Sequence, residues 1–280
     1  MERLLIAGFG DIARRALERL ERRFEVVRLA RSYGVDLDRP GSFSLPAAEA
    51  LLHCAAPPLE GITDTRTANL LAALEKGRIL PARLVYVSTS GVYGDCAGAR
   101  VDESRPPAPQ TERARRRLDA ETQLVQWSEK RGIALVVLRV PGIYAADRLP
   151  LERLRARTPV LRPEDDAHTN HIHAEDLAAI VCRALEADAP AGVYNAADDT
   201  EMKMGDWFDL VADTHGLPRP PRVPREAAPQ KIPAALLSFM QESRRLDNTR
   251  LKNVLGIRLR YPTVREGLRN EHPAHLDQPA

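Results

Sequence analysis

A glycine-rich turn near the start of the chain constrains the fold more than any other feature. It has the pattern G-x-G-x-x-A, it directly follows a short apolar run typical of a buried strand, and it opens an amphipathic helical pattern over 11–22. Glycine lets the chain turn tightly and lets a diphosphate approach free N–H groups at a helix N-terminus. An ordinary strand-to-helix turn is the alternative, but the position favours dinucleotide binding. The residues concerned are Gly8, Phe9, Gly10, Asp11 and Ile12.

Strand-like and helical segments alternate through the first half of the sequence. Apolar runs at 3–8, 24–29, 51–55, 84–87 and 134–138 are separated by helical patterns at 11–22, 65–76 and 112–131. This spacing predicts βαβ units and a parallel sheet covered on both faces, which is an α/β, Rossmann-like doubly wound fold.

The pattern changes near residue 145, where shorter elements and proline-rich loops begin. We therefore expect a dinucleotide-binding domain over 1–145, to which the chain returns around 168–198. Residues 146–280 are expected to form a smaller, mixed substrate-binding lobe that ends in a frayed tail over 272–280.

Composition excludes several classes of function. The chain has 280 residues with 41 basic and 39 acidic side chains, so a formal net charge of +2 argues against a polybasic nucleic-acid surface. Three cysteines without CxxC spacing predict no disulfide framework and no metal site. No run of about 18 apolar residues is present, so no membrane span is expected. A soluble, cytoplasmic protein with a small-molecule substrate is the expectation.

The end of the second predicted strand bears on the choice of cofactor. An NAD site usually carries an acid there, about twenty residues after the glycines, which binds the ribose hydroxyls. This chain has Arg31 and Ser32 instead. An arginine can pair with a 2′-phosphate and a serine can donate a hydrogen bond beside it, which favours NADP over NAD. The alternative is a surface arginine in an arginine-rich protein.

Several segments, in order along almost the whole chain, resemble extended short-chain dehydrogenases of the NAD-dependent epimerase/dehydratase family. The G-x-G-x-x-A start is closer to atypical members of that family than to its usual GxxGxxG. The family often forms dimers, so a homodimer is a candidate assembly. The segments are His53–Pro57, Val87–Asp95, Asp102–Ser104, Leu138–Tyr144, Asn170–Leu177, Tyr194–Asp198 and Leu255–Leu268.

The resemblance implies further site residues. Thr89 would occupy the catalytic Ser/Thr position with Ser88 beside it, and Tyr93 of the same segment would contact substrate. The cofactor contacts that it implies are Asp36 and Leu37 beside the adenine, Cys54, Ala55 and Ala56 along the ribose and nicotinamide, and Pro141, Gly142 and Ile143 against the nicotinamide.

The Y-x-x-x-K proton-relay pair of the family is absent. Arg113 stands at the tyrosine position and Arg117 at the lysine position of the matching helix. Arg117 can still hydrogen-bond ribose hydroxyls, but an arginine stays protonated and cannot act as a general base. Two arginines four residues apart share a helix face, which favours an anionic substrate or is simply a solvated basic surface. The proton would then come from Thr89, Ser88, Tyr144 or water.

Two functions remain open from the sequence. The first is an NADP-linked oxidoreductase or epimerase that acts on a small sugar-like or anionic substrate. The second is a non-catalytic NADP-binding sensor or scaffold, which the missing pair favours. Fold alone does not decide between them.

Overall fold

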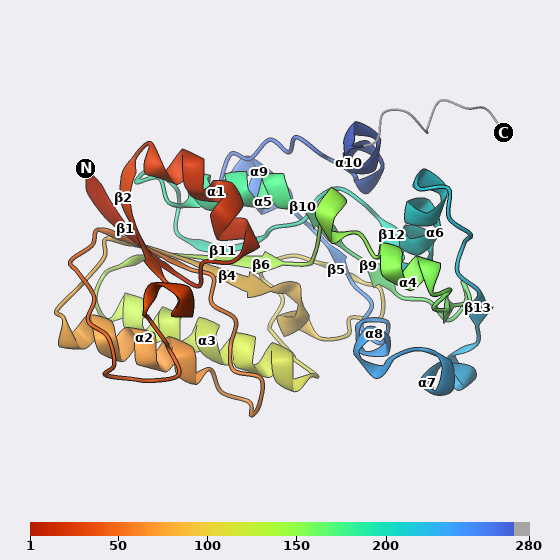
Figure 1. Cartoon of the computed structure of the whole chain (residues 1–280), viewed down its shortest axis with the longest axis horizontal. Coiled ribbons are helices and arrows are strands. Elements are labelled where there is room, and N and C mark those ends of the chain that lie inside the picture. Colours follow the sequence, from red (N-terminus) through yellow and green to blue (C-terminus); the bar gives the residue numbers. More distant parts are fainter. Residues whose placement is uncertain (272–280) are drawn as a thin grey trace.

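A six-stranded parallel sheet forms the centre of the computed structural model, which describes residues 1–271 (Figure 1). The strand order is β11-β6-β4-β3-β1-β2. Strand β2 lies on one side of β1 and all later strands of the sheet lie on the other side, so the direction in which strands are added reverses at β1. This confirms the predicted doubly wound α/β fold. The strands are β1 (Glu2–Ala7), β2 (Phe24–Leu29), β3 (Ala50–His53), β4 (Arg83–Thr89), β6 (Ala134–Val140) and β11 (Gly192–Asn195).

The sheet is buried on both faces because successive side chains point to opposite sides. In β1, Leu4 and Ile6 belong to one apolar cluster, whereas Leu5 and Ala7 belong to the other. Both faces therefore need apolar residues, and the strands read as near-continuous apolar runs.

Two pairs of helices cover the two faces of the sheet. Helices α1 (Asp11–Glu21) and α5 (Ala174–Ala184) pack on one face, and α2 (Thr65–Lys76) and α3 (Glu112–Glu129) on the other (Figure 1). Side-chain caps fix two of the helix starts. The Asp64 carboxylate accepts hydrogen bonds from two backbone N–H groups of α2, and the Thr111 hydroxyl accepts one from Ala114 of α3 at 3.2 Å.

A smaller lobe with its own apolar core follows β6. Its core includes Leu154, Trp207, Phe208 and Leu268. Its helices are α4 (Leu151–Arg155), α6 (Met204–Thr214), α7 (Ala228–Lys231), α8 (Ala234–Phe239) and α10 (Val264–Glu271). Helix α9 (Thr249–Asn253) instead packs on the core of the main sheet beside β11. Two-stranded pairs join these helices: β7 (Gly142–Tyr144) with β10 (His171–His173), β8 (Val160–Leu161) with β13 (Arg222–Val223), β9 (His168–Thr169) with β12 (Met202–Lys203), and β5 (Arg100–Val101) with β14 (Arg245–Leu246).

The chain crosses between the two parts more than once. After β10 it runs through α5 and β11, and β11 pairs with β6 at the edge of the main sheet. Helix α4 is short and begins directly after Pro150, which is its N-cap residue. The expected tail over 272–280 lies outside the described residues. No helix among residues 1–271 is both long and apolar enough to cross a membrane.

Candidate functional site

The glycine turn lies where β1 and β3 end side by side. Gly8 has φ +85°, a backbone conformation that favours glycine, and an added β-carbon would lie 2.3 Å from the Ala55 nitrogen. The Cys54 amide donates a hydrogen bond to the Ala7 carbonyl oxygen at 2.7 Å. The predicted cofactor residues of the first and third strands therefore meet at one edge of the sheet.

Gly10 leaves the start of α1 open. It is the N-cap residue, no side chain caps the helix, and no heavy atom lies within 4 Å of the position that its β-carbon would take. The N-terminus of a helix attracts anions, because its first N–H groups lack partners within the helix. This arrangement fits a dinucleotide diphosphate. Of the other residues of the turn, Ile12 packs in the core, and Phe9 lies edge-on to the ring of Tyr33 at 5.8 Å.

Asp11 is held in a network of charged side chains. Its carboxylate accepts hydrogen bonds from Arg15 at 2.9 Å and from Arg148 at 2.8 Å. Arg15 also pairs with Asp147 and Glu175. The aspartate therefore links the glycine turn to the loop that follows β7, and its carboxylate charge is balanced by arginines.

Arg31 and Ser32 begin a short 3-10 helix after β2, and both are exposed. They lie in the connection that leads to Asp36 and Leu37. The Leu37 side chain is buried in the core, and its carbonyl oxygen accepts a hydrogen bond from Asn69 at 2.7 Å. The Asp36 carboxylate accepts a hydrogen bond from the Asp38 amide, so Asp36 and Leu37 both stabilise the conformation of this loop.

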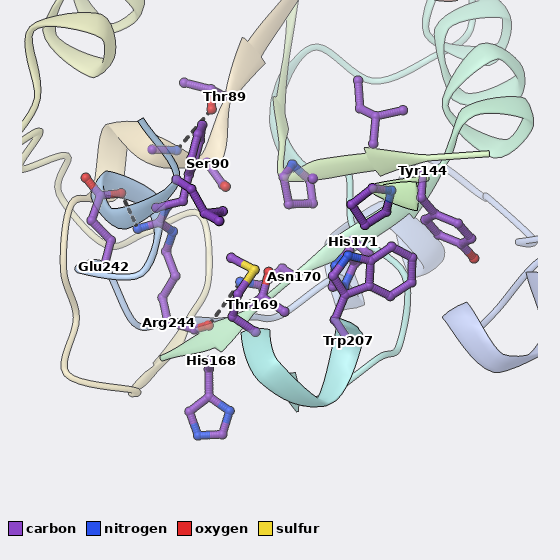
Figure 2. Close-up of a pocket in the computed structure, with 18 of the residues that line it drawn as sticks. Thr89, Ser90, Tyr144, His168, Thr169, Asn170, His171, Trp207, Glu242 and Arg244 are labelled. Atoms are coloured by element: carbon purple, nitrogen blue, oxygen red, sulfur yellow. Dashed lines mark hydrogen bonds and ion pairs between the residues drawn. The ribbon is translucent and has the colours of Figure 1, made fainter. Parts of the chain in front are cut away.

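A cavity of about 280 Å³ opens between the carboxyl ends of β4 and β6 and the smaller lobe (Figure 2). Thr89 and the Pro141–Ile143 segment, which the family resemblance assigns to catalysis and to the nicotinamide, line it. Its charged side chains are Arg113, Arg148, Arg153, Glu242 and Arg244. Its other walls include Pro150, His168, Asn170, His171, Met204, Trp207, Phe208, Leu236 and Phe239.

Ser88 is turned away from this cavity. Its hydroxyl donates to Glu121 at 2.5 Å, and the Glu121 carboxylate in turn pairs with Arg139 at 2.8 Å. All three side chains are buried. The structure therefore corrects the expectation of a catalytic role for Ser88, because successive residues of a strand face opposite sides and only Thr89 reaches the cavity.

The two arginines at the Y-x-x-x-K positions have different surroundings. Arg117 donates to the carbonyl oxygen of Val87 at 3.0 Å and to the hydroxyl of Tyr86 at 3.2 Å, so it bridges α3 and the end of β4. Arg113 lines the cavity, and its guanidinium carbon lies 4.2 Å from the ring centre of Phe239 on α8. Burial lowers the pKa of Arg113 from its usual value.

The two tyrosines that the sequence singled out do not present their hydroxyls to Thr89. Tyr144 lines the cavity with its ring, but its hydroxyl donates to the Thr263 carbonyl oxygen at 3.3 Å and points away from Thr89 (Figure 2). Tyr93 is buried outside the cavity wall, where its hydroxyl donates to Asn195 at 2.9 Å. This placement corrects the expectation that Tyr93 contacts substrate, since the core surrounds it.

Sequence reasoning missed most of the cavity wall contributed by the smaller lobe. Arg153, Trp207 and the pair of Glu242 and Arg244 come from three separate segments between α4 and β14, and no motif joins them. Arg244 donates to Glu242 at 2.9 Å and to the carbonyl oxygen of Gly94 at 2.6 Å. These contacts attach the 242–244 segment to the loop that follows Thr89.

The His171 ring of the cavity packs against an aromatic side chain. His171 is buried, and burial lowers its pKa to about 3. Its ring lies 4.5 Å from that of Trp207. Within residues 1–271 no group of three or more His, Cys, Asp or Glu side chains is placed to hold a metal ion.

Comparisons with known proteins agree with this architecture. A 3-diazoavenalumate denitrifying reductase from a Streptomyces species is 30% identical over 185 residues, which are 64% of this chain and only 59% of that relative. Among solved structures, a functionally unknown conserved protein from Silicibacter pomeroyi DSS is 30% identical, with a TM-score of 0.78 over 98% of this chain and 99% of that chain. The human epimerase family protein SDR39U1 with NADPH shares the fold, at 19% identity and a TM-score of 0.76 over 97% of this chain and 99% of that chain.

A family model connects these likenesses to the site. It matches residues 63–197, which include Thr89, the Pro141–Ile143 segment and the return of the chain to the main sheet, and it describes the NAD dependent epimerase/dehydratase family. The sequence motifs, the strand order and the position of the cavity all agree with it. The sequence of residues 63–197 and the architecture around it therefore resemble the NAD dependent epimerase/dehydratase family.

Proposed function

We propose that this chain is an NADP-linked oxidoreductase or epimerase that acts on a small molecule held in the cavity. The observation that carries the proposal is that Thr89 and the Pro141–Ile143 segment form one wall of that cavity. A nicotinamide against this wall would lie beside the substrate and would supply or accept a hydride. The Streptomyces relative is named as a reductase, which supports redox chemistry.

The chain's own residues fit the dinucleotide. Gly10 leaves the first turn of α1 open to a diphosphate, and Gly8 lets β1 and β3 approach closely. Arg117 would lie near the ribose that precedes the nicotinamide, because it contacts the ends of both β3 and β4. Arg117 would therefore bind the ribose hydroxyls in place of the lysine that the family has at this position.

Arg31 supports a preference for the phosphorylated cofactor. Its guanidinium is exposed at the carboxyl end of β2 and forms no salt bridge within the described residues. The nearby Asp38 is occupied by Arg66, which pairs with it through two nitrogens at 2.7 Å. Arg31 is therefore available to a 2′-phosphate.

The test is a titration with NADPH and with NADH, followed by nicotinamide fluorescence. We expect NADPH to bind at least tenfold more tightly, which corresponds to about 1.4 kcal/mol. Arg31→Ala should remove this difference, whereas Arg22→Ala, which changes an exposed arginine at the far end of α1, should keep it. Equal or tighter binding of NADH by the unchanged protein would contradict the assignment.

Thr89 is the side chain that we place at the reacting atoms. Its hydroxyl oxygen accepts a hydrogen bond from the Gly91 amide at 3.2 Å, which leaves its proton to donate. Arg113 stays charged and cannot accept a proton. We propose that Thr89 hydrogen-bonds the reacting oxygen of the substrate and that water exchanges the proton.

A second candidate is a cofactor-binding sensor without turnover. The observation that favours it is that the cavity tyrosine, Tyr144, directs its hydroxyl at Thr263. The two functions differ in one measurement, the change in nicotinamide absorbance with substrate. Activity that is lost in Thr89→Ala, with NADPH binding retained, would exclude the sensor.

A further inference from the structure

Two guanidinium groups that line the cavity form no salt bridge within the described residues, and the charge of Arg113 interacts with Glu242 only at longer range. Arg148 pairs with Asp11 at 2.8 Å and Arg244 pairs with Glu242 at 2.9 Å. Arg113 and Arg153 form no salt bridge with any residue of the described chain, although both line the cavity. An arginine that lines a cavity without a salt bridge is a binding group for an anion.

The polar groups of the cavity are only partly satisfied within the protein. Asn170 donates from its amide nitrogen to the Arg244 carbonyl oxygen at 3.0 Å and accepts from the Leu246 amide at 2.8 Å. One oxygen of Glu242 accepts from Arg244, whereas its Oε1 atom has no hydrogen-bond partner within the described chain. The Nδ1 atoms of His168 and His171 have none there either.

The remaining walls are apolar or aromatic. Trp207 and His171 lie ring against ring on one side of the cavity, and Figure 2 shows both near Tyr144. His171 is neutral, because burial lowers its pKa to about 3. Phe239 lies at the rim, half exposed beneath Arg113. Flat apolar surfaces of this kind bind flat apolar groups.

We propose that the substrate is a small organic acid with a flat, apolar body. Its carboxylate would pair with the unpaired guanidinium groups of Arg113 and Arg153. Its body would pack against Trp207 and the neighbouring aromatic side chains. This inference rests on the proposed function, because it names the substrate of the same cavity. The cavity volume of about 280 Å³ suits a ligand of this size.

The test is calorimetric titration of the whole protein, with and without NADPH, using trans-cinnamate as the probe. Three comparison ligands separate the contributions: trans-cinnamamide lacks the charge, glucuronate carries a carboxylate on a polyol, and UDP-glucose carries a diphosphate and a sugar. We expect cinnamate to bind at least tenfold more tightly than each of them. An amide that binds as well as the acid, or a sugar ligand that binds more tightly, would overturn the proposal.

Variants locate the binding groups. Arg113→Gln and Arg153→Gln should each weaken cinnamate binding at least tenfold, and Arg113→Lys should restore part of it. Arg155→Gln is the matched control, because Arg155 is exposed on the same helix as Arg153 and does not line the cavity. Unchanged affinity in both glutamine variants would refute the assignment.

The cofactor titration keeps the two proposals apart. Cinnamate binding without NADPH binding would leave the organic-acid site standing and would refute the proposed function. NADPH binding with no binding of cinnamate in either state would refute only the substrate class.

Discussion

Gly8 and Ala55 lie so close together that a β-carbon on residue 8 would come within 2.3 Å of the Ala55 nitrogen. The ends of β1 and β3, which are neighbours in the sheet, therefore lie backbone against backbone at the edge where the dinucleotide is proposed to bind. The contact explains why the first position of the turn requires glycine for the protein to fold. The second glycine, Gly10, has no such neighbour, so the two positions can be tested against each other.

Replacing each glycine with alanine should separate folding from binding. Gly8→Ala adds a clash to a strained φ of +85°, so we expect a loss of about 2–4 kcal/mol in the free energy of unfolding. Gly10→Ala enters open space and should change stability by no more than about 1 kcal/mol. It should nevertheless weaken NADPH binding at least tenfold, because its methyl group would lie in the proposed diphosphate site. Urea unfolding and fluorescence titration measure the two effects. Unchanged NADPH affinity in Gly10→Ala would place the diphosphate elsewhere.

The buried pair of Glu121 and Arg139 should be structural. Glu121→Gln leaves Arg139 without its counter-charge in the core, and we expect a loss of about 3 kcal/mol in the free energy of unfolding. Ser88→Ala removes one hydrogen bond to the same carboxylate and should cost about 1 kcal/mol. The control is Glu129→Gln, an exposed residue at the end of the same helix. Ser88→Ala that retains stability but loses turnover would restore Ser88 as a catalytic candidate.

Tyr144 provides a direct test of where the proton comes from. Tyr144→Phe removes the hydrogen bond to the Thr263 carbonyl oxygen, so the free energy of unfolding should fall by about 0.5–1.5 kcal/mol. Binding of NADPH and of the cavity probe should not change, because the hydroxyl points away from Thr89. The measurements are thermal unfolding, the two titrations and, once a substrate is in hand, turnover. A variant that binds normally but does not turn over would identify Tyr144 as the proton donor.

Asp198 should make the protein less stable as the pH rises. Burial raises the pKa of this carboxyl to about 8, and one of its oxygens has no hydrogen-bond partner within the described chain. The folded state therefore keeps a proton that the unfolded state releases near pH 4. The stabilisation of the folded state that comes from protonated Asp198 is therefore complete below about pH 4. It is lost as the pH rises to about 8, at up to about 1.4 kcal/mol per pH unit.

Asp198→Asn should remove that dependence, because the amide keeps an acceptor oxygen for the Thr200 amide and cannot ionise. We expect the variant to match the unchanged protein near pH 4 and to be more stable at pH 8 by urea unfolding. Asp206→Asn, at an exposed position on α6, serves as the control for a lost aspartate charge. Parallel stability curves for the two variants from pH 4 to 8 would show that Asp198 is ionised in the folded state.

The sequence alone determined the fold class and the edge at which the dinucleotide is proposed to bind. The reason is that both depend on local features: apolar runs of strand length, helical periodicity and a glycine turn directly between a strand and a helix. Helices α2 and the start of α3 followed the pattern because Asp64 and Thr111 are cap residues beside their first turns. The position of Thr89 followed from its motif.

Only the tertiary structure decided which side chains share the cavity and which way they face. Ser88 and Thr89 are neighbours in the sequence, but the alternation of a strand sends one hydroxyl to Glu121 and the other to the cavity. Arg113 on α3 and Arg153 on α4 are distant in the sequence but line the same cavity, and no local pattern encodes this. Whether an arginine is paired or free depends on long-range contacts, because its long side chain can reach acids from distant parts of the chain.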